Sequence, residues 1–407
     1  MDRPIASTAK RGFCVRGAAR RLACAYAEWF NSNAARFIAM AANVKPTPPA
    51  FAHALLKWQR QSGRHDLPWQ TVPSDPYRVW VSEIMLQQTQ VKTVIPYFHR
   101  FMARFPSVDA LALASEHDVL ALWSGLGYYR RARYLLKCAQ AVMQMHGGVF
   151  PTTAETLKTL PGIGPSTAAA IASTVFNERV AILDGNVKRV LARLTCASAP
   201  WGSPMLEREL LQSATRLLPE RSSDMPRYTQ AIMDLGALVC TPRAPRCEAC
   251  PVTALCAAFQ RHQVNAFPVP RQKKTIPLRH AYWCVLVHLQ YVWLVQQSTQ
   301  GIWPGLWLPW ALERDQPPPR WNQTAQGLER VETIQHAFSH YRLQIEAGIV
   351  RWPSATRVPP GAPQGLTRFA WSQALALPLP APVSKLLSRL CPSETAIDGE
   401  PRRRSRS

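Results

Sequence analysis

The chain lacks any long hydrophobic run. None of its 407 residues lies in a stretch of roughly 18 consecutive apolar residues, the length that a membrane-spanning helix requires. The best candidate, residues 282–295, is interrupted by His288 and Gln290. We therefore expect no association with a membrane.

Acidic residues are scarce. The chain has 25 Asp and Glu against 48 Lys and Arg, which gives a formal net charge of +23. Such an excess is typical of proteins that bind a polyanion, most often nucleic acid, and the basic end at 402–406 accounts for only a few of these charges. The hydrophobic content of 47% favours packed domains over disorder, and the length suffices for two or three of them.

The N-terminal region lacks the apolar core of a secretory signal. Residues 1–50 are rich in Arg and Ala and poor in acids, which is typical of a transit peptide or of an added extension. We expect this region to be disordered. Because no secretory signature is present, a framework of disulfides is disfavoured.

Four of the ten cysteines are clustered. Cys240, Cys247, Cys250 and Cys256 follow the spacing C-x6-C-x2-C-x5-C. Four thiolates this close suit either a tetrahedral zinc ion or an iron–sulfur cluster, and the spacing alone does not choose between them. A disulfide pair is the less favoured alternative.

The sequence pattern of the chain changes near residue 265. Before it, apolar residues recur at three- and four-residue spacing and predict helices. A basic, proline-rich linker follows at 267–277, and then Tyr282–Val287 and Tyr291–Val295 predict paired strands. The sequence thus predicts a helical domain followed by a smaller α+β domain. The clearest helical segments are Val79–Val94, Leu111–Leu122 and Leu206–Leu218.

The segment 160–165, Leu-Pro-Gly-Ile-Gly-Pro, predicts a tight turn that leads into a helix at Ser166. Backbone N–H groups at such a helix start can hold a phosphate. The pattern is that of a helix-hairpin-helix element, which grips a DNA backbone without reading its sequence. A turn that only packs two helices together is the alternative.

Two carboxylates could carry chemistry. Asp184 precedes a helix with Lys188 and Arg189, so it is predicted to cap that helix and to be kept ionised by the helix dipole. Glu83 has mostly apolar helical neighbours, which raises the pKa of a carboxyl group. A protonated Glu and an ionised Asp form the acid and stabiliser pair of glycosyl transfer. From position alone, a surface Glu and a capping Asp are the simpler interpretation.

These motifs, in this order, resemble MutY-type adenine DNA glycosylases of the helix-hairpin-helix (endonuclease III) superfamily, which carry a C-terminal Nudix-like domain. The resemblance is dense from residue 51 to about 260 and looser beyond. It rests on the hairpin, the cysteine spacing, and the segments VSEIMLQQTQV (81–91), WSGLGYY (123–129) and ILDGNVKRV (182–190).

The resemblance implies a mainly α, two-lobed glycosylase fold with an iron–sulfur loop, followed by a smaller α+β Nudix-like domain. The implied domains are an extension (1–50), a helical glycosylase domain (51–265), a linker (266–279), a Nudix-like domain (280–391) and a basic tail (392–407). The glycosylase domain would hold a six-helix barrel (about 75–180), the hairpin (160–173) and the iron–sulfur loop (240–256).

The resemblance also implies site residues. Glu83 would protonate the leaving adenine and later help to activate water, while Asp184 would stabilise the oxocarbenium-like sugar. The four clustered cysteines would ligate one 4Fe–4S cluster rather than zinc. An adenine pocket would be lined or supported by Arg64, Trp69, Gln230 and Asp234. Contacts to DNA would come from Gln87, Gln88, Tyr128, Gly162, Gly164 and Ser166.

Ser166 stands where endonuclease III-type relatives carry a lysine that forms a Schiff base with the sugar. Serine cannot form one, so the sequence predicts a monofunctional glycosylase that leaves an abasic site. The adenine must leave the base stack to reach the carboxylates.

The second domain would recognise 8-oxoguanine through Phe338, Ser339 and His340. Without the resemblance, this segment is a strand with one buried Phe and a hydrogen-bonded His. The glutamates of a Nudix catalytic box are missing after Gly301 and Gly305, so hydrolysis of nucleotides is not expected.

The predicted function is removal of adenine paired with 8-oxoguanine or guanine during base excision repair. The alternatives are an endonuclease III-like pyrimidine glycosylase and a non-catalytic iron–sulfur DNA-binding protein. The expected partner of the monomeric chain is double-stranded DNA with such mispairs, and other repair proteins are further candidates. We expect the cytoplasm and nucleoid if the source is bacterial, and the nucleus or mitochondrion if it is eukaryotic.

Overall fold

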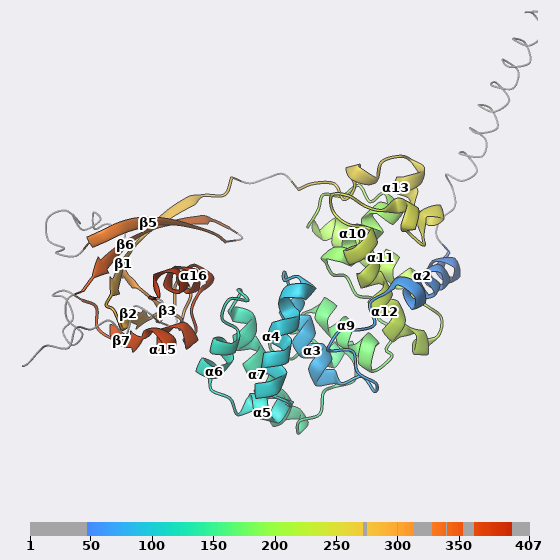
Figure 1. Cartoon of the computed structure of the whole chain (residues 1–407). Helices are drawn as coiled ribbons and strands as arrows, with labels where there is room; N and C mark the ends of the chain where they lie inside the picture. The colour runs from blue at the N-terminus through green and yellow to red at the C-terminus, as the bar shows by residue number, and fades with distance from the viewer. Residues whose placement is uncertain are drawn as a thin grey trace, which may run out of the picture. The chain divides into compact units, whose positions relative to one another are not determined.

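The chain forms two compact units. The computed structural model describes residues 47–271, 275–298, 300–312, 328–338, 340–352 and 362–392 (Figure 1). The first unit combines Met1–Gly63 with Leu183–Arg271, and the second combines Arg64–Ile182 with Gln272–Ser407. Most of the extension predicted to be disordered, and nearly all of the basic tail, lie outside the described residues.

The first unit is helical. The N-terminal helix α2 packs on α12, and the rings of Phe51 and Tyr228 meet edge to face with centroids 6.4 Å apart. A π-helical turn at Leu235–Val239 continues α12 towards the first clustered cysteine. The helices are α2 (Pro48–Ser62), α10 (Gly185–Thr195), α11 (Pro204–Arg216), α12 (Met225–Asp234) and α13 (Ala257–Gln260).

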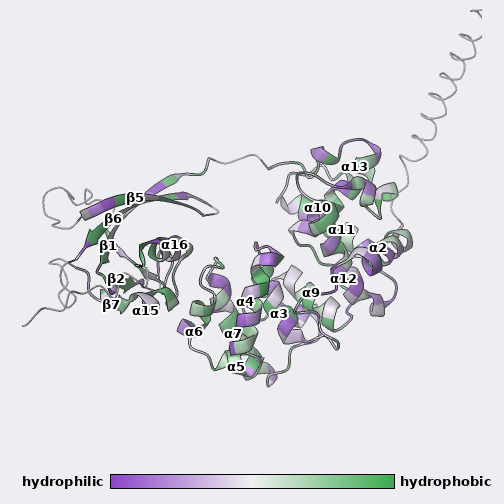
Figure 2. Ribbon diagram, in the orientation of Figure 1, coloured by the Kyte–Doolittle hydropathy of each residue, from purple (hydrophilic) through white to green (hydrophobic). Residues whose placement is uncertain are grey.

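The N-terminal part of the second unit, residues 64–182, is also helical. Its core is aromatic, with Trp80, Phe98, Phe101 and Trp123 fully buried. Figure 2 shows apolar and polar residues side by side on these helices, as expected when one face packs inward. The helices are α3 (Pro76–Leu86), α4 (Val91–Arg104), α5 (Val108–Ala112), α6 (Glu116–Leu122), α7 (Arg130–His146), α8 (Ala154–Leu157) and α9 (Pro165–Val175).

Two helices predicted as continuous are each divided in two. The segment Val79–Val94 is broken between α3 and α4, where Gln88 is left-handed (φ 58°) and the guanidinium of Arg131 binds three backbone carbonyls at the end of α3. The segment Leu111–Leu122 is broken between α5 and α6, where the Ser115 hydroxyl accepts the N–H of Asp118 in the first turn of α6 at 3.1 Å. Tertiary contacts and capping outweigh apolar periodicity at both breaks.

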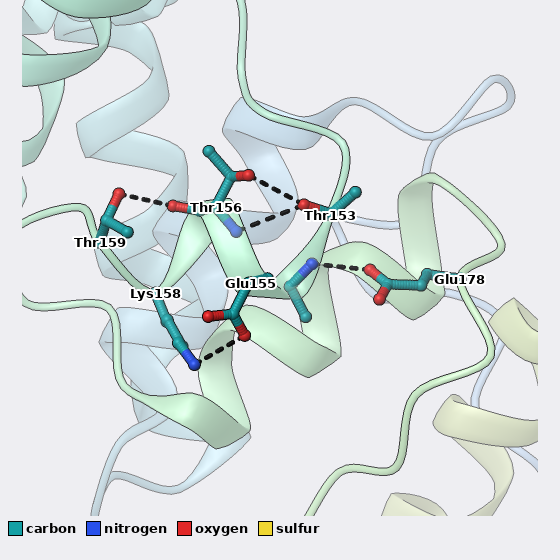
Figure 3. A network of polar contacts seen from close by, with 7 residues as sticks. Thr153, Glu155, Thr156, Lys158, Thr159 and Glu178 are labelled. Atoms are coloured by element: carbon teal, nitrogen blue, oxygen red, sulfur yellow. Dashed lines mark hydrogen bonds and ion pairs between the residues drawn. The ribbon is translucent and has the colours of Figure 1, made fainter.

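The short helix α8 is held at its start by two side chains (Figure 3). The hydroxyl of Thr153 accepts the N–H of Thr156 at 3.3 Å, and the carboxylate of Glu178 accepts the N–H of Ala154 at 2.6 Å. Glu178 follows α9, so it ties the end of α9 to the start of α8. The hairpin between these helices is therefore anchored from both sides.

Seven strands form the sheet of residues 278–370. The order is β3-β2-β1-β6-β5, with β4 paired to β1 and β7 to β2. The predicted strand pair is confirmed, because β1 and β2 are antiparallel neighbours. Helix α16 lies beside the sheet (Figure 1) and buries Val383, Leu386 and Leu387. The strands are β1 (Leu278–Val287), β2 (Tyr291–Gln296), β3 (Trp307–Leu308), β4 (Trp310–Leu312), β5 (Leu328–Ala337), β6 (Arg342–Arg351) and β7 (Thr367–Ala370), and helices α15 (Trp371–Ala376) and α16 (Ala381–Leu390) follow.

The architecture is thus mainly α with a smaller sheet-containing domain after it, as predicted. Across the described ranges, no helix has both the length and the apolar character needed to cross a bilayer. The helix α2 begins at Pro48 and β1 at Leu278, in each case just before the predicted boundary.

Candidate functional site

Asp184 caps helix α10 with its own carboxylate. One oxygen accepts the N–H of Val187 at 2.7 Å, and the Asn186 amide donates to the other at 3.4 Å. The helix start was predicted to favour the ionised form, and its hydrogen bonds to Asp184 do lower the pKa of this carboxylate, as does the nearby Arg189. Burial has the larger effect and raises the pKa of Asp184 above its ordinary value.

Two arginines fasten α10 to the cysteine segment. The Arg189 guanidinium donates to the carbonyl oxygens of Cys240 at 2.8 Å and Gly236 at 2.6 Å. The buried Arg193 donates to the Cys240 sulfur at 3.2 Å and to the Thr241 carbonyl at 2.8 Å. The helix that begins at Asp184 therefore depends on the cysteine segment for its position.

The four clustered cysteines line one small cavity of about 30 Å³. Burial raises the pKa of the Cys247 and Cys250 thiols, and raises that of Cys256 to about 11. Thiolates in this place therefore need an electropositive centre to balance them, and the Arg193 guanidinium supplies only part of that charge.

The four clustered cysteines offer an all-thiol set of donors around one cavity. Four thiolates can bind a tetrahedral zinc ion or a 4Fe–4S cluster, so the chemistry of these donors fits either group.

Glu83 lies half-buried on α3, one turn after Val79 and the fully buried Trp80. At the end of this helix, the Gln87 amide donates to the Thr167 hydroxyl at 3.4 Å, which links α3 to the start of α9. Glu83 belongs to the second unit and Asp184 to the first. The raised pKa expected for Glu83 stays a prediction.

The residues predicted to form an adenine pocket come from both units. In the first, the Gln230 amide donates to the carboxylate of the fully buried Asp234 at 2.8 Å, so the structure brings this pair together. In the second, Trp69 is nearly buried and meets Phe98 edge to face with centroids 5.5 Å apart, which makes it a core residue. Arg64 begins the second unit and is partly exposed.

Two exposed loop residues, Gln88 and Tyr128, have left-handed backbones with φ of 58° and 51°. Between their loops lies the buried Arg131, whose guanidinium donates to the carbonyl oxygens of Gln87 at 2.6 Å and Gly127 at 3.1 Å. Burial lowers the pKa of Arg131 to about 10. Sequence reasoning missed this residue, although its place two residues after the Gly-Tyr-Tyr segment is a usable signal.

A cavity of about 840 Å³ brings several predicted residues together. Its lining includes Gln88 and Tyr128 from the helical loops, Gly162 from the hairpin, and Phe338 and His340 from the sheet domain. It also includes Gln87. The third residue of the predicted recognition segment, Ser339, lies outside the described residues.

The sheet side of this cavity is aromatic. Phe338 stacks on Tyr341 with ring centroids 4.5 Å apart, and contacts Trp303 at 5.5 Å and His336 at 4.7 Å. Trp303 and His336 also line the cavity, and neither was among the predicted site residues. Such a cluster offers a rigid surface on which a flat base can stack.

The hairpin requires glycine at its turn. Gly162 has φ of 79°, and a Cβ atom there would lie 2.5 Å from the Cβ of Tyr134. Gly164 is the N-cap of α9, where no side chain caps the helix and Ser166 is its second residue. The start of α9 can therefore offer backbone N–H groups to an anion.

The chain is similar to known proteins over most of its length. Residues 81–216 match the family described as HhH-GPD superfamily base excision DNA repair protein, and residues 281–389 match the NUDIX domain. An adenine DNA glycosylase of Buchnera aphidicola (strain APS) is 36% identical over 307 residues, which cover 74% of this chain and 87% of that protein.

Similarity extends to eukaryotic proteins. The adenine DNA glycosylase of Mus musculus is 36% identical over 77% of this chain and 73% of its own length, and that of Homo sapiens is 47% identical over 52% and 40%. Among solved structures, a thermostable thymine-DNA glycosylase matches with a TM-score of 0.45 and 26% identity, over 52% of this chain and 95% of that one.

Proposed function

Because the chain belongs to the adenine DNA glycosylase family, we propose that this base excision repair enzyme removes adenine paired with 8-oxoguanine or guanine and leaves an abasic site. The observation that most supports this substrate is the cavity of about 840 Å³ shared by Tyr128 and Gln88 of the helical part and Phe338 of the sheet domain. Loops that can part a duplex and an aromatic surface that can hold a base border the same space.

In the proposed reaction, Glu83 protonates the adenine base while the bond between the base and the sugar breaks. The electron pair of that bond leaves with the base, and the sugar becomes oxocarbenium-like. The Asp184 carboxylate stabilises this positive charge, and Glu83 then accepts a proton from the water that adds to the sugar. The products are free adenine and an abasic site.

The two carboxylates suit different roles because their surroundings differ. Asp184 is held in one orientation by the start of α10, so its charge needs little reorganisation as the sugar becomes cationic. Glu83 lies half-buried on α3, one turn after Val79 and Trp80, and in the proposal it is the group that carries the proton.

The remaining proposed roles concern the DNA. Arg64, Trp69, Gln230 and Asp234 would line or support the pocket for the flipped adenine, while Gln88 and Tyr128 would wedge into the duplex on the side of the opposite base. The start of α9, with Gly162, Gly164 and Ser166, would hold a backbone phosphate. The net charge of +23 favours this polyanionic partner.

The four clustered cysteines would hold one 4Fe–4S cluster. When bound, it adds an electropositive centre that allows four thiolates to be buried together. Arg189 and Arg193 of α10 hold the Cys240 segment through its carbonyls and sulfur, so these residues place Asp184 relative to the cysteine loop. The cysteine loop is thus proposed to position the active site and DNA rather than to react.

Because Ser166 cannot form a Schiff base, we expect base release without strand cleavage. The predicted domain boundaries, the monomeric state and the compartments named for a bacterial or eukaryotic source form part of the same proposal.

The test is single-turnover base release from a duplex with one adenine opposite 8-oxoguanine. We expect a break at the adenine only after alkali, and its loss in Glu83→Gln. A variant that binds the duplex, keeps its cluster and still releases adenine at the wild-type rate contradicts the role of Glu83. Cleavage without alkali contradicts the monofunctional reaction.

A further inference from the structure

The loop that presents Tyr128 is held by the C-terminal domain of the same unit. The Tyr129 hydroxyl donates to the backbone carbonyl of Leu379 at 2.5 Å, and the Ser124 hydroxyl donates to the same oxygen at 3.1 Å. The Leu379 N–H in turn lies 3.4 Å from the Ser124 oxygen. We call these three residues the latch.

Two of the three latch residues are buried, and Ser124 is half-buried. Leu379 is completely buried, and Tyr129 is 7% exposed. The Tyr129 hydroxyl also accepts the N–H of Gly125 at 3.1 Å, so both its donor and its acceptor capacity are used. Burial raises the pKa of Tyr129, which keeps the hydroxyl protonated as a donor. A buried hydroxyl with two partners is costly to lose, because either partner would then be left unsatisfied.

On the helical side, the latch adjoins the loop residue that borders the cavity. Tyr128 precedes Tyr129 in the chain, is 50% exposed and lines the cavity. Its backbone conformation is left-handed, with φ of 51°, which residues other than glycine adopt only when their surroundings hold them there. The position of Tyr129 therefore sets where the Tyr128 ring can lie.

On the other side, the latch adjoins strand β3 of the sheet domain. The carbonyl of Pro378 accepts the N–H of Trp307 at 3.0 Å, which fixes the Leu379 segment to this strand. A second contact joins helix α7 to the same domain: Arg133 forms an ion pair with Glu116 at 2.7 Å and donates to the carbonyl of Pro304, the residue after Trp303 of the aromatic cluster. The helical part and the sheet domain are thus joined by hydrogen bonds as well as by apolar contact.

We infer that Ser124 and Tyr129 are positioning residues that make the placement of Tyr128 depend on the C-terminal domain, and so contribute to the preference for adenine opposite 8-oxoguanine over adenine opposite guanine. The inference rests on the proposed function. When the sheet domain binds 8-oxoguanine, it holds the Leu379 carbonyl in place, and that carbonyl in turn holds the loop that presents Tyr128. Opposite guanine the domain is seated less firmly, and the latch contributes less.

The test compares Tyr129→Phe with the matched control Tyr77→Phe. Tyr77 is also a buried tyrosine of the helical part, and its hydroxyl donates to the carbonyl oxygen of Phe105 at 2.8 Å. Neither residue belongs to the latch. Single-turnover rates are measured on both mispairs. We expect Tyr129→Phe to lower the rate ratio of the 8-oxoguanine duplex to the guanine duplex by roughly threefold to tenfold, the effect of one hydrogen bond, and Tyr77→Phe to leave the ratio unchanged.

A double-mutant cycle with Phe338→Ala provides a readout that a merely structural role would not move. If the latch acts through the recognition surface, Tyr129→Phe will lower the ratio much less in the Phe338→Ala background than in the wild type. Equal losses on both mispairs, or losses that multiply in the double variant, would overturn the inference. Ser124→Ala serves the same test if Tyr129→Phe does not fold. Failure of the proposed function is distinct, because the wild type would then release adenine from neither duplex.

Discussion

The helical and sheet parts of the second unit hold their functional side chains in different ways. In the helical part, Gln88 and Tyr128 project from strained loops whose carbonyls converge on one buried guanidinium, that of Arg131. In the sheet domain, Phe338 and Trp303 lie in an aromatic cluster whose members support one another by stacking. The first arrangement specifies the position of single atoms, and the second provides a surface.

This difference suggests that the two parts serve different steps, the removal of the base and the discrimination between the two mispairs. A reaction at one bond needs groups placed within a fraction of an ångström, which hydrogen bonds to backbone atoms provide. Discrimination between guanine and its oxidised form needs a surface on which a base can rest. We therefore expect loss of the proposed general acid Glu83 to affect both mispairs alike, and changes in the sheet domain, or in the latch that ties the Tyr128 loop to it, to affect the ratio of their rates.

The largest effect is expected for Glu83→Gln. Loss of the proposed general acid should lower adenine release by about a hundredfold to ten-thousandfold on both mispairs, with little change in DNA affinity. Single-turnover rates and duplex affinity measure this. Glu155→Gln is the control, since Glu155 is exposed and its carboxylate forms an ion pair with Lys158 at 2.7 Å. If Glu83→Gln lowered the rate of adenine release on only one mispair, the expectation that Glu83 acts on both mispairs alike would be contradicted.

Loss of the cysteine loop's proposed cluster should lower the rate on both mispairs, as loss of Glu83 does. We expect Cys250→Ser to lose the visible absorption of an iron–sulfur cluster and most of about four irons per chain, and to lose activity on both mispairs because Asp184 is no longer held in place. Iron analysis and absorption spectra measure this. Cys196→Ser is the control, because Cys196 belongs to the same unit but lies outside the cysteine cavity. Retention of iron in Cys250→Ser would contradict the assignment of the ligands.

A change in the sheet domain should instead lower the rate on one mispair more than on the other. We expect Phe338→Ala to lower the preference for the 8-oxoguanine duplex by roughly tenfold, the loss of one stacked base, and to leave the rate on the guanine duplex nearly unchanged. Phe369→Ala is the control, since Phe369 packs on Trp307 with centroids 4.9 Å apart and does not line the cavity. Equal rate losses on both duplexes would show that Phe338 only stabilises the domain.

The smallest effect concerns pH. Asp184 must be ionised to stabilise the sugar, and burial raises its pKa. Activity should therefore fall on the acid side at a pH above the ordinary Asp value of about 3.9. Asn186→Ala removes a hydrogen bond that lowers this pKa, so it should move the acid limb to still higher pH. Rates between about pH 4 and pH 8 test this, and an acid limb that moves downward in the variant would contradict it.

Much of the fold follows from local patterns. Runs rich in Val, Tyr and Trp predicted β1 and β2, and apolar periodicity located α3, α4, α6 and α11. The breaks at Gln88 and Leu113 escaped prediction because their causes are non-local in one case and a single capping hydroxyl in the other. The raised pKa of Asp184 escaped it because burial is a property of packing.

The sequence by itself determined the chemistry that this protein can carry: two carboxylates, four clustered thiols, a glycine hairpin and no hairpin lysine. These are matters of residue type and short spacing, which a chain specifies locally. Only the tertiary structure decided that Tyr128 and Phe338 border one cavity, that Arg131 holds two loops, and that Ser124 bonds Leu379 across 255 positions. The physical reason is that burial and hydrogen-bond partners depend on which distant segments pack together, and no spacing along the chain encodes that directly.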